Sequence, residues 1–109
     1  MYTYKAKVTH LVDGDTMDCD IDLGFYMQAR IRVRFARIDA PETYGKLKED
    51  AGIITREFVR DQLDACKWEV KISTDKTGKF GRWIAEIWCG DENLNDLLVK
   101  NGLAREVTY

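Results

Sequence analysis

Hydrophobic and polar side chains alternate along the first third of the chain, which is the pattern of β-strands that bury one face. The alternation predicts strands over residues 2–12, 16–23 and 29–38. Asp13-Gly14, between the first two strands, is typical of a hairpin turn. Pro41 ends the third strand, because proline cannot donate a ladder hydrogen bond and biases the preceding residue toward an extended backbone.

The period changes to that of an amphipathic helix between residues 46 and 66. The apolar side chains of this segment recur at helical spacing, and the charged ones lie elsewhere. The predicted apolar stripe comprises Ala51, Ile54, Phe58 and Cys66, with Leu63 beside it. We expect this face to cover part of the sheet.

The last part of the chain returns to strand-like alternation and closes with a short helix. Strands are predicted over residues 68–73 and 82–89, and an amphipathic helix over 93–101 that Gly102 ends. This element order is typical of a small closed barrel of the oligonucleotide/oligosaccharide-binding type. We therefore expect one α+β, mainly β domain over residues 1–109: a five-stranded OB-fold barrel with a helix after strand 3 and a short C-terminal helix.

Composition agrees with one compact domain and narrows its class. The 109 residues are 45% apolar and 33% charged, which is enough for one core but not for two domains. With 17 basic and 19 acidic residues the net charge is −2, unlike that of a protein dedicated to tight, nonspecific binding of nucleic acid. A nuclease stays compatible with this charge, because a bound divalent cation would supply positive charge at the phosphate.

The cysteines and the start of the chain bear on its compartment. Cys19, Cys66 and Cys89 lie far apart and form no Cys-x-x-Cys pair, so a zinc site is not expected and a reducing compartment is the simpler interpretation. The first residues lack the apolar run of a signal peptide, and no stretch approaches the length of a membrane span. We expect a cytoplasmic protein with no membrane partner, or a secreted one if a leader has been removed.

Two rows of charged side chains follow the second and third strands. Asp18, Asp20 and Asp22 alternate with apolar residues, which predicts an acidic outer face; the position of the next glycine excludes an EF-hand. The third strand carries three arginines at the same spacing: Arg30, Arg32 and Arg34. This row is either a solvated face opposite the core or a stripe that faces phosphate, and the alternation alone allows both.

Three short stretches carry side chains that could cut a phosphodiester bond with a hard metal ion. Their carboxylates, which are the oxygen ligands that such ions prefer, are Asp13, Asp15, Asp39 and Glu42. Arg34 and Arg82 could grip phosphate oxygens bidentately, and Lys79 and Phe80 precede Arg82 on a polar loop where they could contact substrate. Each stretch alone also fits an ordinary turn or solvated loop, so the prediction depends on the fold bringing them together.

Together these stretches resemble the staphylococcal nuclease (thermonuclease) family. The matching segments, in the family's order, are Val12-Asp13-Gly14-Asp15-Thr16, Arg34 with Ile38-Asp39-Ala40-Pro41-Glu42, Asp75-Lys76 with Gly81-Arg82, and Asn95 with Leu98 and Asn101-Gly102-Leu103-Ala104. The resemblance covers most of the chain. It implies a calcium-dependent endonuclease that hydrolyses DNA and RNA and leaves the phosphate on the 3′ side of the break.

The resemblance also implies which residues hold the metal. Asp15 and Asp39 look like the metal carboxylates, and the backbone carbonyl of Ala40 looks like a further ligand, although the family often has threonine at this position. Asp13 looks like an acid beside the ligands. Oxygen ligands would admit magnesium or manganese as well as calcium.

The catalytic roles follow from the same resemblance. Glu42 matches the acid that positions or deprotonates the attacking water, and Arg34 and Arg82 match the two arginines that clamp the phosphate. Phe80 replaces the family's tyrosine on the basic loop, which keeps a stacking surface but loses a phenolic hydrogen bond.

Two further departures concern length. The stretch between Asp15 and Arg34 is longer than in the family's best-known member, which lengthens the hairpin around Gly24-Phe25-Tyr26, and we expect this extension next to the site. The chain ends at Tyr109, where that member continues into another helix, so we expect a monomer or a weak homodimer that covers apolar surface.

The alternative function is a catalytically inactive OB-fold module that binds nucleic acid. Both metal carboxylates, the glutamate and both arginines are present, and a pure binder has no physical need for that set. The sequence therefore favours the enzyme.

Overall fold

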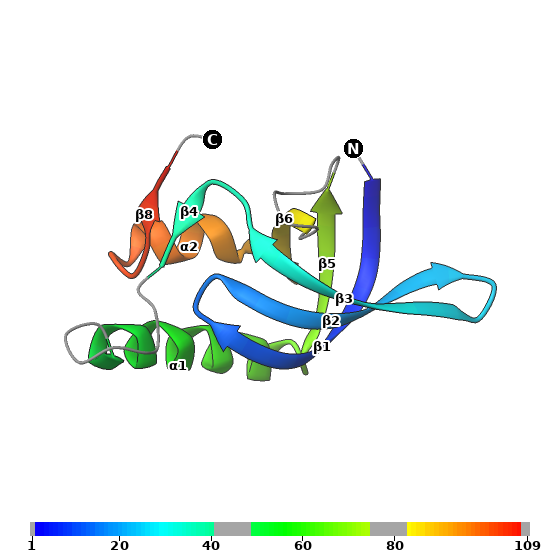
Figure 1. Cartoon of the computed structure of the whole chain (residues 1–109), viewed down its shortest axis with the longest axis horizontal. Coiled ribbons are helices and arrows are strands. Elements are labelled where there is room, and N and C mark those ends of the chain that lie inside the picture. Colours follow the sequence, from blue (N-terminus) through cyan, green and yellow to red (C-terminus); the bar gives the residue numbers. More distant parts are fainter. Residues whose placement is uncertain (1, 41–48, 75–82, 108–109) are drawn as a thin grey trace.

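The computed structural model describes residues 2–40, 49–74 and 83–107 of the chain. In chain order its elements are β1 (Tyr2–Asp13), β2 (Thr16–Gly24), β3 (Met27–Phe35), β4 (Ile38–Asp39), α1 (Glu49–Ala65), β5 (Glu69–Thr74), β6 (Trp83–Cys89), β7 (Glu92–Asn93), α2 (Leu94–Lys100) and β8 (Arg105–Glu106) (Figure 1). None of the helices within these ranges is long and apolar enough to cross a membrane.

Five of these strands close into a barrel. Their order is β3-β2-β1-β5-β6, and β3 closes the sheet by pairing in parallel with β6 over Val33–Phe35. Helix α1 follows the third barrel strand and packs against β1 and β6, while α2 packs against β6. The predicted mainly β OB-fold barrel with two helices is therefore confirmed. The short strands β4, β7 and β8 were not predicted, because two residues are too few to show a period.

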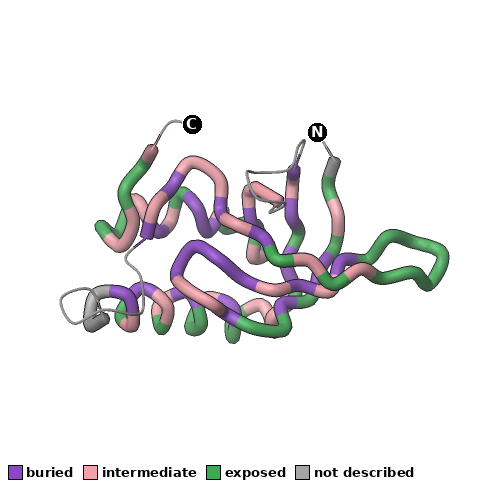
Figure 2. The backbone as a smooth tube through the Cα atoms, viewed as in Figure 1, coloured by how far each residue is buried: buried purple, intermediate pink, exposed green. Residues whose placement is uncertain are grey.

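The barrel core follows the alternation in the sequence. The side chains of Met17, Cys19 and Ile21 on β2 are buried, and so are Val33 and Phe35 on β3. The buried stretches lie where strands and helices face one another, and the far end of the β2–β3 hairpin is exposed (Figure 2). Alternation thus predicted correctly which face of these strands points inward.

The face that α1 buries differs from the predicted stripe. Ile54 is 59% exposed, whereas Thr55, Val59 and Leu63 are buried against the barrel. Threonine can occupy this interior position because its hydroxyl donates a hydrogen bond to the Leu103 carbonyl, 3.1 Å away. Phe58 and Cys66 are half-buried as flanking residues, and the Ala51 side chain lies outside the described residues.

A disulfide joins the end of α1 to β6. Cys66 and Cys89 are bonded, with their Cα atoms 5.8 Å apart, and the spacing of the cysteines along the chain gave no sign of this pairing. Cys19 is free and buried in the barrel, and this burial raises the pKa of its thiol to about 12. The compartment of the protein stays a prediction.

The outer part of the β2–β3 hairpin projects from the barrel (Figure 1). We call residues 18–32 the arm; the side chains of Cys19 and Ile21 at its inner end still belong to the barrel core, and its outer end contributes to the elongated shape of the molecule, 45 × 30 × 22 Å. The hairpin base pairs Thr16 with Arg34, while near the tip Asp22 pairs with Gln28. Six residue steps along β3 put Gln28 about 20 Å from Arg34. The expectation that the longer hairpin lies next to the site is therefore wrong: strand length carries its tip away.

Candidate active site

Asp15 is a buried carboxylate in the turn between β1 and β2. Its side chain is almost inaccessible, and each oxygen has a partner. The Thr16 hydroxyl lies 3.1 Å from Oδ1, and the Ala40 backbone N–H donates to Oδ2 over 3.0 Å. Arg34 Nη1 also donates to Oδ2, over 3.3 Å. These bonds fix the carboxylate between the first turn and the segment that follows β4.

Arg34 connects the two predicted metal carboxylates. It lies opposite Thr16 at the hairpin base, and its side chain is only 16% exposed. Besides contacting Asp15, its guanidinium donates from Nη2 to the Ile38 carbonyl over 3.3 Å and lies 3.6 Å from Asp39 Oδ1. The structure thus brings together three residues that the sequence predicted separately: Asp15, Arg34 and Asp39.

Asp39 has a second cationic neighbour that the sequence did not indicate. Arg105 on β8 lies opposite it in a two-residue antiparallel pairing and donates from Nη2 to Asp39 Oδ2 over 3.1 Å. The two residues are far apart in the chain, and neither short strand leaves a periodic signal. Arg105 is the charged residue at this site that sequence reasoning missed.

Gly14 lets the acidic turn approach α1 closely. A Cβ atom at this position would collide with the Thr55 methyl group and lie 3.4 Å from the Ala40 Cβ. The glycine is therefore required by close packing, in addition to forming the predicted turn. This contact presses the turn that carries Asp15 against both α1 and the segment after β4.

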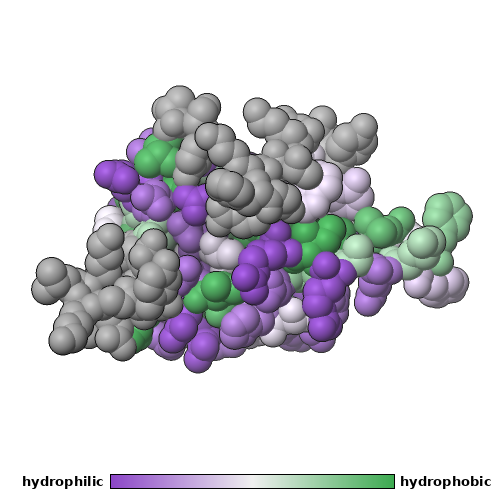
Figure 3. Space-filling model, viewed as in Figure 1, coloured by the Kyte–Doolittle hydropathy of each residue, from purple (hydrophilic) through white to green (hydrophobic). Residues whose placement is uncertain are grey.

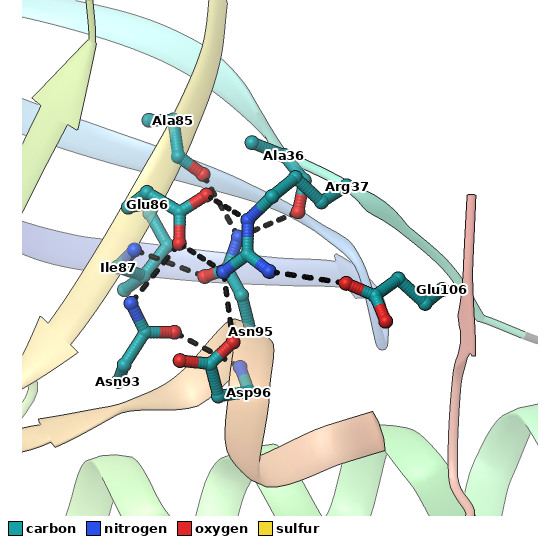
Figure 4. A network of polar contacts seen from close by, with 9 residues as sticks. All are labelled: Ala36, Arg37, Ala85, Glu86, Ile87, Asn93, Asn95, Asp96 and Glu106. Carbon is teal, nitrogen blue, oxygen red and sulfur yellow. Dashed lines mark hydrogen bonds and ion pairs between the residues drawn. The ribbon is translucent and has the colours of Figure 1, made fainter. Parts of the chain in front are cut away.

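A buried amide supports the turn between β3 and β4. The side chain of Asn95 on α2 is fully buried; its Oδ1 accepts from the Ile87 N–H over 3.0 Å, and its Nδ2 donates to the carbonyls of Ala36 and Ala85 over 2.8 and 3.2 Å (Figure 4). One side chain thus ties α2, β6 and the turn together. These hydrogen bonds explain why position 95 is an asparagine. In the sequence alone, Asn95 is only one of the residues that match the family.

Arg37 joins the same turn to three further elements. Its backbone is left-handed, with φ at 66°, and its guanidinium contacts Glu86, Asp96 and Glu106 (Figure 4). The neighbouring carboxylates, Glu86 first and then Asp96, raise the pKa of Arg37, so it stays charged. Because Ile38-Asp39 follows directly, this network helps to set where Asp39 lies.

The other two arginines of β3 belong to a solvated face. Arg30 Nε lies 2.9 Å from Asp20 and Arg32 Nε lies 2.8 Å from Asp18, each directly across the strand pair. These arginines lower the pKa values of both aspartates. Of the three arginines on β3, Arg30 and Arg32 belong to the solvated face and neutralise the acidic side chains of β2, whereas Arg34 lies in the candidate site.

The described residues supply part of a ligand set for a hard cation. They contain no group of three His, Cys, Asp or Glu side chains placed to hold a metal. Asp15 and Asp39 nevertheless offer carboxylate oxygens on either side of one guanidinium, which is suitable donor chemistry for calcium or magnesium. Asp13, half-buried at the end of β1, pairs across the turn with Thr16. The predicted residues Glu42, Lys79, Phe80 and Arg82 lie outside the described residues.

Comparison with known proteins agrees with this arrangement. Residues 32–109 match the family described as staphylococcal nuclease homologue. The chain is 32% identical to the thermonucleases of Staphylococcus intermedius and Staphylococcus hyicus, over 104 and 112 residues, covering 94% of this chain and 59% of each relative. It is also 32% identical over 110 residues to endonuclease YhcR of Bacillus subtilis (strain 168), covering 93% of this chain and 9% of that protein.

The alignments to these relatives span nearly the whole chain but only part of each relative, and the family match covers residues 32–109. The chain corresponds to less than two thirds of the length of the two thermonucleases. The family match contains Arg34 and Asp39. The chain belongs to the staphylococcal nuclease family.

Proposed function

We propose that the protein is a calcium-dependent endonuclease that hydrolyses phosphodiester bonds of DNA and RNA and leaves 3′-phosphate ends. The observation that supports this most directly is the buried group at the hairpin base, where Arg34 contacts Asp15 and lies beside Asp39. A low-exposure arginine between two carboxylates offers positions for a cation and for a phosphate next to each other.

The chain's own oxygens would hold the cation. Asp15 and Asp39 would contribute carboxylates and Ala40 its backbone carbonyl, with Asp13 as a nearby acid. Calcium ordinarily takes six to eight oxygens, so water and a substrate phosphate would complete the shell. Bound there, the cation would neutralise charge on the phosphate and polarise a non-bridging oxygen.

Arginines and one glutamate would act on the substrate directly. Arg34, held at the site by the Ile38 carbonyl, and Arg82 would donate hydrogen bonds to phosphate oxygens and stabilise them most as negative charge grows in the transition state. Glu42 would orient the attacking water and accept its proton. Lys79 and Phe80 would contact the backbone and a base of the bound strand.

The test is cleavage of single-stranded DNA and of RNA with calcium, magnesium, manganese or a chelator. We expect cutting that requires calcium and yields 3′-phosphate termini. Asp15→Asn should abolish it, because the buried carboxylate loses its charge, while the matched arm variant Asp20→Asn should cut like wild type. Binding of single strands without cleavage by folded wild type in every metal would contradict the proposal and favour the OB-fold binding module.

A further inference from the structure

The tip of the arm exposes an apolar group of side chains. Phe25 and Tyr26 are 95% and 107% exposed, and Met27 and Leu23 beside them are 61% and 44% exposed. Figure 3 shows hydrophobic colour at this projecting end and along the upper side of the arm, and hydrophilic colour along the lower side. Large apolar side chains that gather on a projection indicate an interaction surface rather than part of the core.

The backbone at the tip is also unfavourable for the residues that occupy it. Phe25 and Tyr26 both adopt left-handed conformations, with φ at 55° and 62°. A tight hairpin of this kind favours Asn-Gly, and bulky L-residues are strained in it. Two aromatic residues here raise the energy of the isolated hairpin and bury nothing, which indicates that they serve contact with a partner.

The arm carries a free strand edge next to this tip. On one side β3 pairs with β2, and on the other its pairing with β6 begins only at Val33, so in the described part of the chain nothing pairs with the outer edge before that residue. The Phe35 N–H points to β2 and the Ala36 N–H points to β6, so backbone groups of even-numbered residues face the outer edge. Those on the arm are Gln28, Arg30 and Arg32.

These features select the chemistry of the partner. Arg30 and Arg32 are already paired with Asp20 and Asp18, so the arm offers no unpaired cationic row to a nucleic-acid backbone. The open backbone donors and acceptors along β3 would lose their water inside lipid without gaining partners. An extended polypeptide strand would satisfy them, as in strand addition to a sheet edge.

We propose that this edge pairs antiparallel with the same edge of a second copy of the chain, about a twofold axis at Ala29. This register opposes Gln28 to Arg30 and Met27 to Ile31, and it sets the ring of Tyr26 against the aliphatic and cationic side chain of Arg32. If the twofold axis lay one residue further along, at Arg30, the Arg30 side chains of the two copies would lie opposite each other, and their like charges would repel. The inference concerns assembly and does not depend on the nuclease proposal.

The expected interface is small. In this register each copy contributes Tyr26, which buries about 150–250 Å² when covered, and Met27, beside the backbone edge from Gln28 to Arg32. The total lies below about 1,200 Å², the size at which specific interfaces begin. The dimer is therefore reversible and concentration-dependent.

The first test is sedimentation velocity of the whole chain over a concentration series. Gln28→Pro removes an N–H that faces the free edge, a change that an edge strand tolerates, so dimerisation should weaken at least about tenfold. Gln28→Ala keeps the N–H and should dimerise like wild type. Wild type that stays monomeric throughout, or Gln28→Pro that dimerises equally well, overturns the proposal.

The tip and the register are tested separately. Replacing Phe25→Asn together with Tyr26→Gly supplies the residues that the turn favours, so the melting temperature of the monomer should rise while dimerisation is lost. Under mild oxidation Ala29→Cys should form a covalent dimer much faster than Arg30→Cys, and the reverse order would overturn the register. If wild type stays monomeric but binds vesicles of phosphatidylcholine and phosphatidylglycerol through Phe25 and Tyr26, the tip serves a lipid surface and the dimer is wrong.

Discussion

The base and the arm of the β2–β3 hairpin both carry an arginine–aspartate pair, but the two pairs differ in how far they are buried. At the base Arg34 faces Asp15, with the two side chains 16% and 6% exposed; on the arm Arg32 faces Asp18, with 53% and 22% exposed. The arm pair has the shorter contact, 2.8 Å against 3.3 Å. Ion-pair distance therefore does not distinguish the candidate site from the solvated arm.

The difference lies in what surrounds each pair. At the base the β1–β2 turn, β3, β4 and α1 converge, and their contacts bury the Asp15 carboxylate and most of the Arg34 side chain, while Asp39 stays 44% exposed. Charges in such a setting interact more strongly with one another and with a ligand than charges in water do. On the arm the same groups are solvated, and exposed pairs of this kind contribute little.

Replacing each arginine by lysine should affect activity at the base and leave it unchanged on the arm. Lysine carries a single ammonium and cannot span Asp15, the Ile38 carbonyl and Asp39 as the guanidinium does. We expect Arg34→Lys to lower kcat about 10²–10³-fold with little change in KM. Arg32→Lys should leave steady-state DNA cleavage unchanged, and equal losses in both variants would contradict the distinction between base and arm.

The buried hydrogen bonds of Asn95, which support the turn between β3 and β4, should contribute to the free energy of unfolding. Asn95→Ala removes the partner of the buried Ile87 N–H and of the Ala36 carbonyl, whereas the Ala85 carbonyl keeps its hydrogen bond from the Ala36 N–H. We therefore expect the unfolding free energy to fall by about 2–4 kcal/mol. Asn101→Ala on the exposed end of the same helix removes only a local bond to the Leu97 carbonyl and is the matched control. Urea unfolding measures both; a loss no larger than the control would show that the buried amide is not required.

Gly14, in the turn before β2, and Gly24, at the end of β2, separate the cost of close packing from the cost of a strained backbone. Gly14→Ala forces a methyl group into Thr55 and should cost about 1–3 kcal/mol of stability, part of which Thr55→Ser restores by removing the methyl it meets. Gly24→Ala meets no atom within 4 Å, but its φ of 80° should cost about 1 kcal/mol. Thermal unfolding of Gly14→Ala and Gly24→Ala, each with and without Thr55→Ser, tests this, and Thr55→Ser should not rescue Gly24→Ala.

The smallest expected effect is the pH response of the arm. Arg32 holds the pKa of Asp18 below its ordinary value of 3.8, so the ion pair stabilises the folded state above that value and the contribution disappears as pH falls through the folded pKa. Carboxyl NMR titration should place Asp18 below 3.8 in wild type and closer to it in Arg32→Ala. An unchanged midpoint in that variant would show that the pair does not control the titration.

The features that could be predicted from the sequence are those encoded by residues close together in the chain. Alternation identified the inward faces of β2 and β3, and the motif singled out Asp15, Arg34 and Asp39 before their contacts were known. Alternation could not separate Arg34 from Arg32, because both have the same parity and only their distance from the hairpin base distinguishes them. The roles of Glu42, Lys79, Phe80 and Arg82 stay predictions.

The unpredicted features depend on contacts between distant segments. Arg105 reaches Asp39 through two strands of two residues each, and Thr55 replaces Ile54 on the buried face because a carbonyl outside the helix satisfies its hydroxyl. The direction of the hairpin tip was misjudged for the same reason: added length says how far a loop extends but not toward which part of the fold. These features are determined by strand register and by pairing between segments far apart in the chain.

The Cys66–Cys89 bond makes residues 66–89 a covalent ring. The ring contains β5, which pairs with β1, and β6, which pairs with β3 to close the barrel. A protease that cuts one peptide bond inside it yields a nicked chain that is still a single molecule, and the pieces separate only after reduction. Reassembly of the nicked barrel would therefore be unimolecular and independent of protein concentration, whereas a cut outside the ring would divide the chain into two fragments that must find each other in solution.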